Sequence, residues 1–236
     1  MKILAVEFSS AQRSVAVWEA GGTAASPTLL GSALQPPMPR LENSLFTIQN
    51  SQFSLQRSLG LVEEALGEAN CRREEIGALA VGLGPGSYTG IRGAIALAQG
   101  WQLGRGTGLL GVSSVECLAA QAQAEGRHGP VNIIIDAQRR EFYLARYEIA
   151  ADGWRQAEAL RLAPMAEIEA LAAAGQALLG PDITRWFGGG KDLCPAAVML
   201  GRLACARRDF VPGEKLEPVY LRETAFRKAP PPRTIP

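Results

Sequence analysis

The stretch GLGPGSYTGIR, residues 82–92, decides how the middle of this chain folds. It follows a short apolar run, residues 78–82, that is typical of a buried strand, and it leads into residues 91–103, whose apolar spacing predicts a helix. Glycine allows the backbone to turn with positive φ and to approach another group closely. Ser87 or Thr89 can cap the helix. The stretch is therefore a tight strand-to-helix connection.

The same stretch has a second interpretation as an anion site. Successive backbone N–H groups at a helix start form a nest for phosphate. The candidate residues for such a nest are Gly84, Gly86, Ser87, Thr89 and Gly90. A Walker P-loop is excluded because no lysine lies between Lys2 and Lys191, and a Rossmann fingerprint is excluded by the glycine spacing. From the residues alone, the stretch is either a phosphate-binding cradle or a capped turn without a ligand.

Outward from this stretch, each half of the chain begins with a hairpin and continues with alternating strands and helices. The expected strands are 3–8, 14–18, 28–34, 78–82, 109–112, 131–136, 142–149 and 177–179, and the expected helices include 51–69, 91–103, 164–174 and 195–207. This order predicts an α/β protein of two lobes. We expect residues 1–106 to form the first lobe, 107–228 the second, and the proline-rich residues 229–236 a disordered tail.

Composition narrows the function classes. Of 236 residues, 47% are hydrophobic, which is enough for a real core, and the net charge of +1 argues against a protein that holds nucleic acid by itself. The sequence contains no apolar run of about 18 residues, so no membrane span is predicted. Glu7 comes too early for a signal peptide. Four dispersed cysteines without an export signal indicate a reducing cytoplasm.

Side chains for catalysis are scarce. The one histidine, His128, lies in a polar loop, so neither a Ser-His-Asp triad nor a zinc site has its ligands, and we predict no catalytic or metal-binding residue. Glu7 and Asp136 each end an expected strand, and Ser9 and Ser10 form the turn after the first strand. Carboxylates at strand ends beside a cleft could hold a metal-nucleotide, or they could simply cap turns.

The helix expected over residues 91–103 has unusually small side chains. Gly93 and Gly100 lie in its interior, where each glycine costs about 1 kcal/mol relative to alanine. Close packing against a neighbouring helix would explain both. That neighbour is either the helix expected over residues 51–69 or a helix of a partner protein, and the spacing alone favours the first.

Several motifs in order resemble one known family. GPGSYTGIR at residues 84–92 agrees closely with the pattern Gly-Pro-Gly-Ser-Phe-Thr-Gly-Leu-Arg of the TsaB family, also called YeaZ. Other segments similar to the family are ILAVEFSS at 3–10, GVSSVE at 111–116, IDAQRREFY at 135–143 and PVYLR at 218–222. Together they span most of the chain.

The resemblance implies a two-lobed actin-like ATPase fold, related to ribonuclease H, in a non-catalytic, cytoplasmic subunit of tRNA threonylcarbamoyladenosine modification. It implies binding to the transferase TsaD through helices of the first lobe, with the ATPase TsaE engaging the pair. On this chain the matching positions are Leu55, Leu59, Val62, Leu66, Gly93, Ala94, Leu97, Gly100 and Trp101. We expect a homodimer when TsaD is absent, because exposed apolar faces rarely stay bare.

We expect no cofactor in this subunit, with ATP or ADP only at an interface shared with partners. Transfer RNA would be contacted only through the complex. Arg139, Arg140 and Arg146, or the basic residues of the tail, could contribute to a joint basic surface or could be solvated charges.

The chain departs from the family pattern at two places. Glu7-Phe8-Ser9 stands where the family often has Asp-Thr-Ser, and Asn50-Ser51-Gln52 stands where it often has His-Ser-Glu. Both departures weaken the case for independent metal catalysis. The alternative is a small-molecule kinase or ATPase of the same fold that uses the glycine stretch with Ser9, Ser10 and Asp136. A peptidase lacks the necessary metal ligands.

Overall fold

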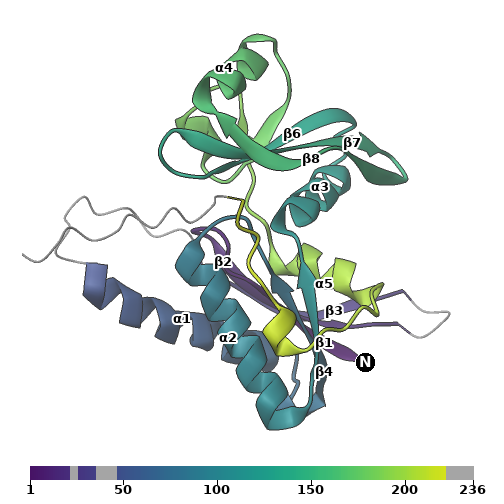
Figure 1. Ribbon diagram of the computed structural model, residues 1–236. Coiled ribbons are helices and arrows are strands. Elements are labelled where there is room, and N and C mark those ends of the chain that lie inside the picture. Colours follow the sequence, from purple (N-terminus) through teal and green to yellow (C-terminus); the bar gives the residue numbers. More distant parts are fainter. Residues whose placement is uncertain (22–25, 36–46, 222–236) are drawn as a thin grey trace, which may run out of the picture.

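The computed structural model describes residues 1–21, 26–35 and 47–221, with the side chains of its first helix from Arg57 onward. Two five-stranded sheets form two lobes, each packed against helices (Figure 1). The expected tail at 229–236 and the side chain of Leu55 lie outside the described residues. Within the described ranges, no helix is both long and apolar enough to cross a membrane.

The first sheet has the strand order β3-β2-β1-β4-β5. Its first three strands pair antiparallel, and β4 and β5 then join parallel to β1. Their bounds are β1 (Lys2–Glu7), β2 (Arg13–Glu19), β3 (Thr28–Gln35), β4 (Ile76–Gly82) and β5 (Gly108–Val112). Every residue of β1 after Lys2 is buried, as expected of a central strand covered on both faces.

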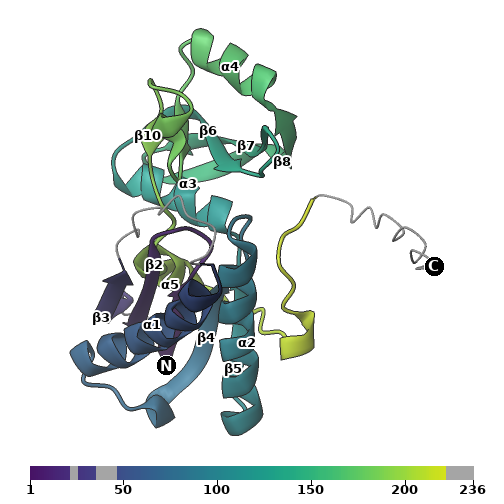
Figure 2. The ribbon, with the colours of Figure 1, turned by 90° about the vertical axis from the view of Figure 1, so that its left-hand side faces the viewer.

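Helices cover both faces of this sheet. On one face lie α1 (Thr47–Glu68) and α2 (Tyr88–Arg105), and on the other lies α5 (Ala197–Cys205) (Figures 1 and 2). The alternation of β1 divides its side chains between two cores. Leu4 and Val6 pack with α1 and α2, whereas Ile3 and Ala5 pack with α5.

The second sheet repeats this topology. Its order is β10-β9-β6-β7-β8, so β6 takes the place of β1, with an antiparallel hairpin on one side and parallel strands on the other. The strands are β6 (Gly129–Asp136), β7 (Glu141–Ala150), β8 (Gly153–Pro164), β9 (Leu178–Gly180) and β10 (Lys191–Asp192). Helix α3 (Ser114–Ala124) packs on one face of this sheet and α4 (Met165–Ala173) on the other.

The expected lobe boundary at residue 106 falls too early. Strand β5 pairs with β4 and completes the first sheet, so that lobe continues to Val112. The chain also returns to the first lobe near its end, because α5 covers the first sheet and Leu216 joins the core beneath α1 and α2. Local sequence pattern does not predict contacts between segments so far apart, so it could not place this boundary.

Strand β8 is absent from the expected elements. Most of its residues are exposed at the edge of the second sheet, and its sequence GWRQAEALRLAP contains glutamate and several alanines, which have low strand propensity. Pairing with β7, rather than local preference, holds this segment extended.

Candidate functional site

The glycine stretch packs directly on the turn between β1 and β2. A methyl group added at Gly86 would collide with the carbonyl oxygen of Ser9, and one added at Gly90 would collide with that of Phe8. The backbone N–H of Ser87 donates to the Ser9 carbonyl at 2.6 Å. Ser87 is also the N-cap of α2, and its hydroxyl oxygen accepts from the N–H of Gly90 at 3.3 Å. These glycines therefore bring two backbone segments of the chain together.

This packing supports the capped turn over the phosphate cradle. The Ser87 N–H, which a nest would need, already has a partner in Ser9. Gly84 adopts a φ of 84°, and its N–H donates to the hydroxyl of Ser114 at 3.2 Å. Thr89 is exposed on the first turn of α2. The N–H groups of Gly84, Ser87 and Gly90 thus have partners within the protein, and Gly86 packs on the backbone of Ser9.

Glu7 lies beneath the stretch and is completely buried. Its carboxylate accepts from the backbone N–H of Ser9 at 2.7 Å and from the Ser114 hydroxyl at 2.9 Å. A side chain at Gly82 would collide with this carboxylate. Burial raises the pKa of Glu7, and the hydrogen bonds from Ser9 and Ser114 oppose that rise. Glu7 thereby joins the end of β1 to the start of α3.

Asp136 ends β6 in the equivalent place. Its carboxylate accepts from the backbone N–H of Gln138 at 2.7 Å and from the Gln138 side-chain amide at 3.2 Å. Ser10 donates its hydroxyl to the Gln12 carbonyl at 2.8 Å. Both strand-end acids therefore cap turns. No group of three or more histidine, cysteine or acidic side chains suited to a metal ion occurs among the described residues.

Two of the three candidate arginines lie in the turn between β6 and β7, and Arg146 lies further along β7. Arg139 and Arg140 are exposed, each with a φ of 60°. Arg146 instead pairs with Glu158 at 3.5 Å on the neighbouring strand. Of the three, only Arg139 and Arg140 have side chains at the surface without an ion pair in the described part of the chain.

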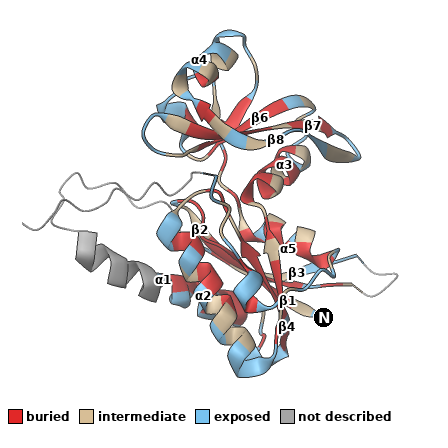
Figure 3. Ribbon diagram, in the orientation of Figure 1, coloured by how far each residue is buried: buried red, intermediate tan, exposed pale blue. Residues whose placement is uncertain are grey.

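The interface candidates on α1 and α2 divide by burial. Val62, Leu66 and Ala94 are at most 4% exposed and belong to the core over the first sheet, so in this conformation they cannot contact a partner. Leu97 and Trp101 are partly buried against that core. Of the other candidates, Leu59 is 45% exposed, Gly100 is exposed and Gly93 is half-buried. Figure 3 shows exposed residues along the outer sides of α1 and α2.

The helix glycines face away from the protein. Among the described residues, a methyl group added at Gly93 or Gly100 would meet no atom within 4 Å beyond the adjacent backbone of its own helix, and the same holds at Gly60 and Gly67 of α1. Each pair is seven residues apart, which places both members on one side of its helix. Packing between α1 and α2 therefore does not account for Gly93 and Gly100, contrary to the interpretation that spacing alone favours.

An aromatic contact at the end of the chain was not predicted. Tyr220 stacks on Tyr88 of α2 with ring centroids 5.4 Å apart, and the guanidinium of Arg92 lies 5.1 Å from the Tyr88 ring centre. The N–H of Val219 donates to the carbonyl of Leu83 at 2.8 Å. The motif PVYLR marked this segment as notable, but no local signal indicated that it lies along the glycine stretch.

Comparisons with known proteins agree with this architecture. The family model described as "TsaD: tRNA N6-adenosine threonylcarbamoyltransferase" matches residues 49–190. The tRNA threonylcarbamoyladenosine biosynthesis protein TsaB of Escherichia coli is 31% identical over 98% of this chain and 99% of its own length. TsaB of Bacillus subtilis is 34% identical over 37% of each chain.

Solved structures extend the likeness to the whole fold. YeaZ from Pseudomonas aeruginosa superposes with a TM-score of 0.70 at 27% identity, covering 93% of this chain and 99% of that one. A second Pseudomonas aeruginosa structure, described as similar to peptidase YeaZ, gives 0.72 at 28% identity over 94% and 99%. The actin-like, ribonuclease H-like class expected for both lobes is confirmed. This chain belongs to the TsaB family of tRNA threonylcarbamoyladenosine biosynthesis proteins, within the wider family that the TsaD model describes.

Proposed function

We propose that this chain is the non-catalytic subunit of the tRNA threonylcarbamoyladenosine modification machinery and that it binds and activates TsaD through the outer faces of α1 and α2. TsaE then engages the pair. The observation that carries the proposal is a set of glycines on α1 and α2, Gly60, Gly67, Gly93 and Gly100, at which an added methyl group would contact no other described part of the chain.

The energetic argument rests on these glycines. Each one costs a helix about 1 kcal/mol relative to alanine. A partner helix that approaches closely can offset this cost, since the missing side chains allow backbones to meet. Leu59 and the exposed edges of Leu97 and Trp101 supply apolar area beside them. A stable contact of this kind buries at least about 1,000 Å² in total.

The chemistry between the lobes supports a non-catalytic role. Glu7 and Asp136, which would hold a metal-nucleotide in an enzyme of this shape, both cap backbone turns. We therefore propose that activation is a population shift, in which binding favours the active conformation of TsaD. In this proposal the subunit has no cofactor of its own, and ATP or ADP binds only at an interface shared with partners.

The remaining parts of the proposal concern the free subunit. With TsaD absent, the same apolar face pairs with a second copy and gives a homodimer. The protein acts in the cytoplasm. It contacts tRNA only in the complex, where the exposed Arg139 and Arg140 supply positive charge.

Size-exclusion chromatography of mixed purified subunits tests the interface. Wild type should co-elute with TsaD, whereas Gly93→Leu and Gly100→Leu should each separate from it while keeping the wild-type circular dichroism spectrum. The matched control is Gly189→Leu, an exposed position of the second lobe where an added methyl group also meets no atom of the described residues beyond its chain neighbours within 4 Å. Unchanged complexes for both α2 variants would contradict the placement of the face.

Calorimetry separates this proposal from a kinase or ATPase. The isolated chain, titrated with magnesium-ATP, should show neither tight binding nor turnover, because the glycine stretch is engaged with Ser9. Tight binding with hydrolysis would favour the enzyme instead.

A further inference from the structure

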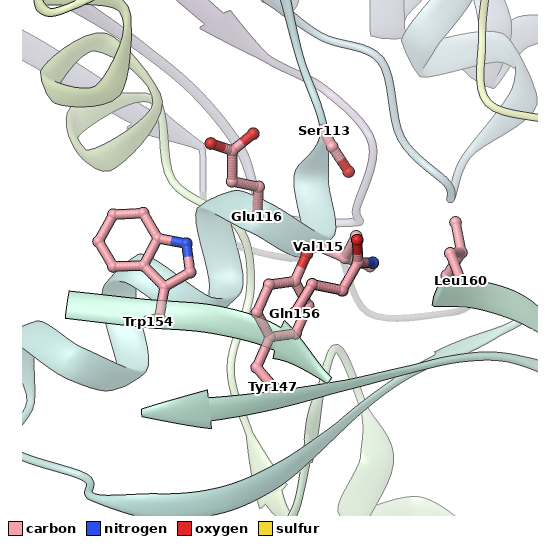
Figure 4. A pocket seen from close by; sticks show the side chains of 7 residues that line it. All are labelled: Ser113, Val115, Glu116, Tyr147, Trp154, Gln156 and Leu160. Atoms are coloured by element: carbon pink, nitrogen blue, oxygen red, sulfur yellow. The ribbon is translucent and has the colours of Figure 1, made fainter. Parts of the chain in front are cut away.

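A cavity of about 310 Å³ lies in the second lobe between the side of α3 and strands β7 and β8 (Figure 4). It is separate from the glycine stretch and from the outer faces of α1 and α2. Val115 of α3, Tyr147 of β7, and Trp154 and Leu160 of β8 form its walls. Its volume is at the lower end of the range for small-molecule sites, about 300–1,000 Å³.

The cavity has a cause in the backbone. Along β7 and β8 the pairing passes from Leu144↔Arg161 to Arg146↔Glu158 and then to Tyr147↔Gln156, with a register shift at each step. Such bulges bend an edge strand and re-aim its side chains. The bulged stretch of β8 forms one wall of the space beside α3.

Tyr147 brings an unpartnered hydroxyl into this space. Its side chain is 5% exposed, and its hydroxyl makes no hydrogen bond within the described part of the chain. In Figure 4 the hydroxyl points toward α3, near Val115 and Gln156. Burial, together with the negative charge of Glu116, raises the pKa of Tyr147 to about 12, so it remains a hydrogen-bond donor. The hydroxyl faces the cavity with no partner among the described residues, so it can donate a hydrogen bond to a ligand there.

The other polar groups of the lining suit an uncharged ligand. Gln156 offers both a donor and an acceptor, and Figure 4 shows the nitrogen-bearing edge of Trp154 turned toward Tyr147 and Glu116. No lysine or arginine lines the cavity, so nothing there would neutralise a phosphate or a carboxylate. Its one charged lining residue, Glu116, lies 3.7 Å from the guanidinium of Arg207, which balances its charge.

We propose that this cavity binds a planar nitrogen heterocycle of nucleobase size, which stacks on Trp154 and accepts a hydrogen bond from Tyr147. Flat aromatic walls favour a planar ligand, and stacking of a base on an aromatic side chain contributes about 1–3 kcal/mol. Mixed donors and acceptors such as Gln156 and Glu116 match the edge of a base, which carries both. The base could come from a free nucleoside or from single-stranded RNA.

Titration of the isolated full-length chain tests this proposal independently of any TsaD interface. The probes are adenosine, cytidine, uridine, adenosine 5′-monophosphate and a short single-stranded RNA of mixed sequence. The readouts are tryptophan fluorescence and the indole N–H signal of Trp154 in NMR spectra. At least one nucleoside should bind saturably, and its 5′-monophosphate should bind no tighter. Tighter binding of the RNA than of every nucleoside would identify single strands as the source, and the reverse would identify free nucleosides.

Two variants locate the binding. Tyr147→Phe should weaken it about tenfold, the usual effect of one lost hydrogen bond, without lowering the thermal midpoint. Trp154→Ala should weaken it tenfold or more. The control is Trp186→Ala, because Trp186 is 37% exposed in the same lobe and lies outside the cavity lining. Absence of saturable binding by all probes, or binding that neither Tyr147→Phe nor Trp154→Ala weakens, would overturn the proposal.

Discussion

The two lobes share one strand order but use the end of their central strand differently. In each lobe an acidic residue closes that strand and accepts the N–H two residues later at 2.7 Å, Glu7 from Ser9 and Asp136 from Gln138. Glu7 is completely buried and also holds Ser114, whereas Asp136 is partly exposed and bonds only within its own turn. The same position is a deep structural junction in one lobe and a surface turn in the other.

The hydrogen bonds of these strand ends also bear on where a ligand could bind. Ligands of open α/β sheets bind where the carboxyl ends of the strands meet. Here that edge is occupied by hydrogen bonds within the chain, from the Ser114 hydroxyl to the Glu7 carboxylate and from the Ser87 N–H to the Ser9 carbonyl. Gly60, Gly67, Gly93 and Gly100 lie elsewhere, on α1 and α2, and a methyl group added there would contact no other element among the described residues. In the proposed function, the two-lobed shell presents this helical surface to a partner.

We expect the largest loss of stability where a parallel strand packs against the central strand of each lobe. Gly180 closes β9, and a methyl group there would collide with the backbone carbonyl of Ile134 in β6. Gly180→Ala should lower the free energy of unfolding by about 3 kcal/mol, because backbone cannot move aside. Gly82→Ala, at the equivalent end of β4, meets the side chain of Glu7 and should cost about half as much. Urea denaturation measures both, and a reversed order would break the comparison.

The acids themselves provide the next test. Glu7→Ala leaves the buried donors of Ser9 and Ser114 without an acceptor and should cost about 2 kcal/mol or more. Asp136→Ala removes bonds at a partly exposed turn and should cost about 1 kcal/mol or less. Equal losses in urea denaturation would mean that the two strand ends are equivalent after all.

The pH dependence of stability sharpens the role of Glu7. Burial raises the pKa of this carboxyl above 4.5, so the folded protein binds the proton more tightly than the unfolded chain does. Its contribution is therefore complete at lower pH and is lost as the pH rises through the folded pKa. The stability of wild type relative to Glu7→Gln should fall by up to about 1.4 kcal/mol per pH unit between pH 4.5 and the folded pKa, and should stay constant above it. A difference between the two proteins that does not change with pH would contradict this.

The smallest expected effect is a gain in stability. Gly93→Ala and Gly100→Ala add a methyl group that contacts no other element in the described part of the chain, so each should stabilise the isolated protein by about 0.5–1 kcal/mol. Gly90→Ala in the same helix should do the opposite, because its methyl group would collide with the Phe8 carbonyl. Thermal unfolding of dilute protein gives all three values. Destabilisation by Gly93→Ala would show that this face has a packing role within the monomer.

Local sequence pattern predicted elements well where propensity and burial agree. The helix expected over residues 91–103 is part of α2, and the apolar run at 131–136 lies in β6. The exposed edge strand β8 was missed, because pairing with β7 overrides its composition. The glycine stretch was located, but its role was left open, since nothing local shows that Gly86 and Gly90 contact Ser9 and Phe8. The cavity beside Tyr147 depends on bulges that no local pattern indicates.

The central claim is that the helical surface, and not the junction between the lobes, carries the function. The most direct test is the yield of threonylcarbamoyladenosine in tRNA when TsaD and TsaE are supplied with each variant of this subunit. We predict that Gly93→Leu combined with Gly100→Leu abolishes modification, and that Ser10→Ala combined with Asp136→Ala leaves it near the wild-type level. Full activity in the first double variant and loss of activity in the second would contradict the account.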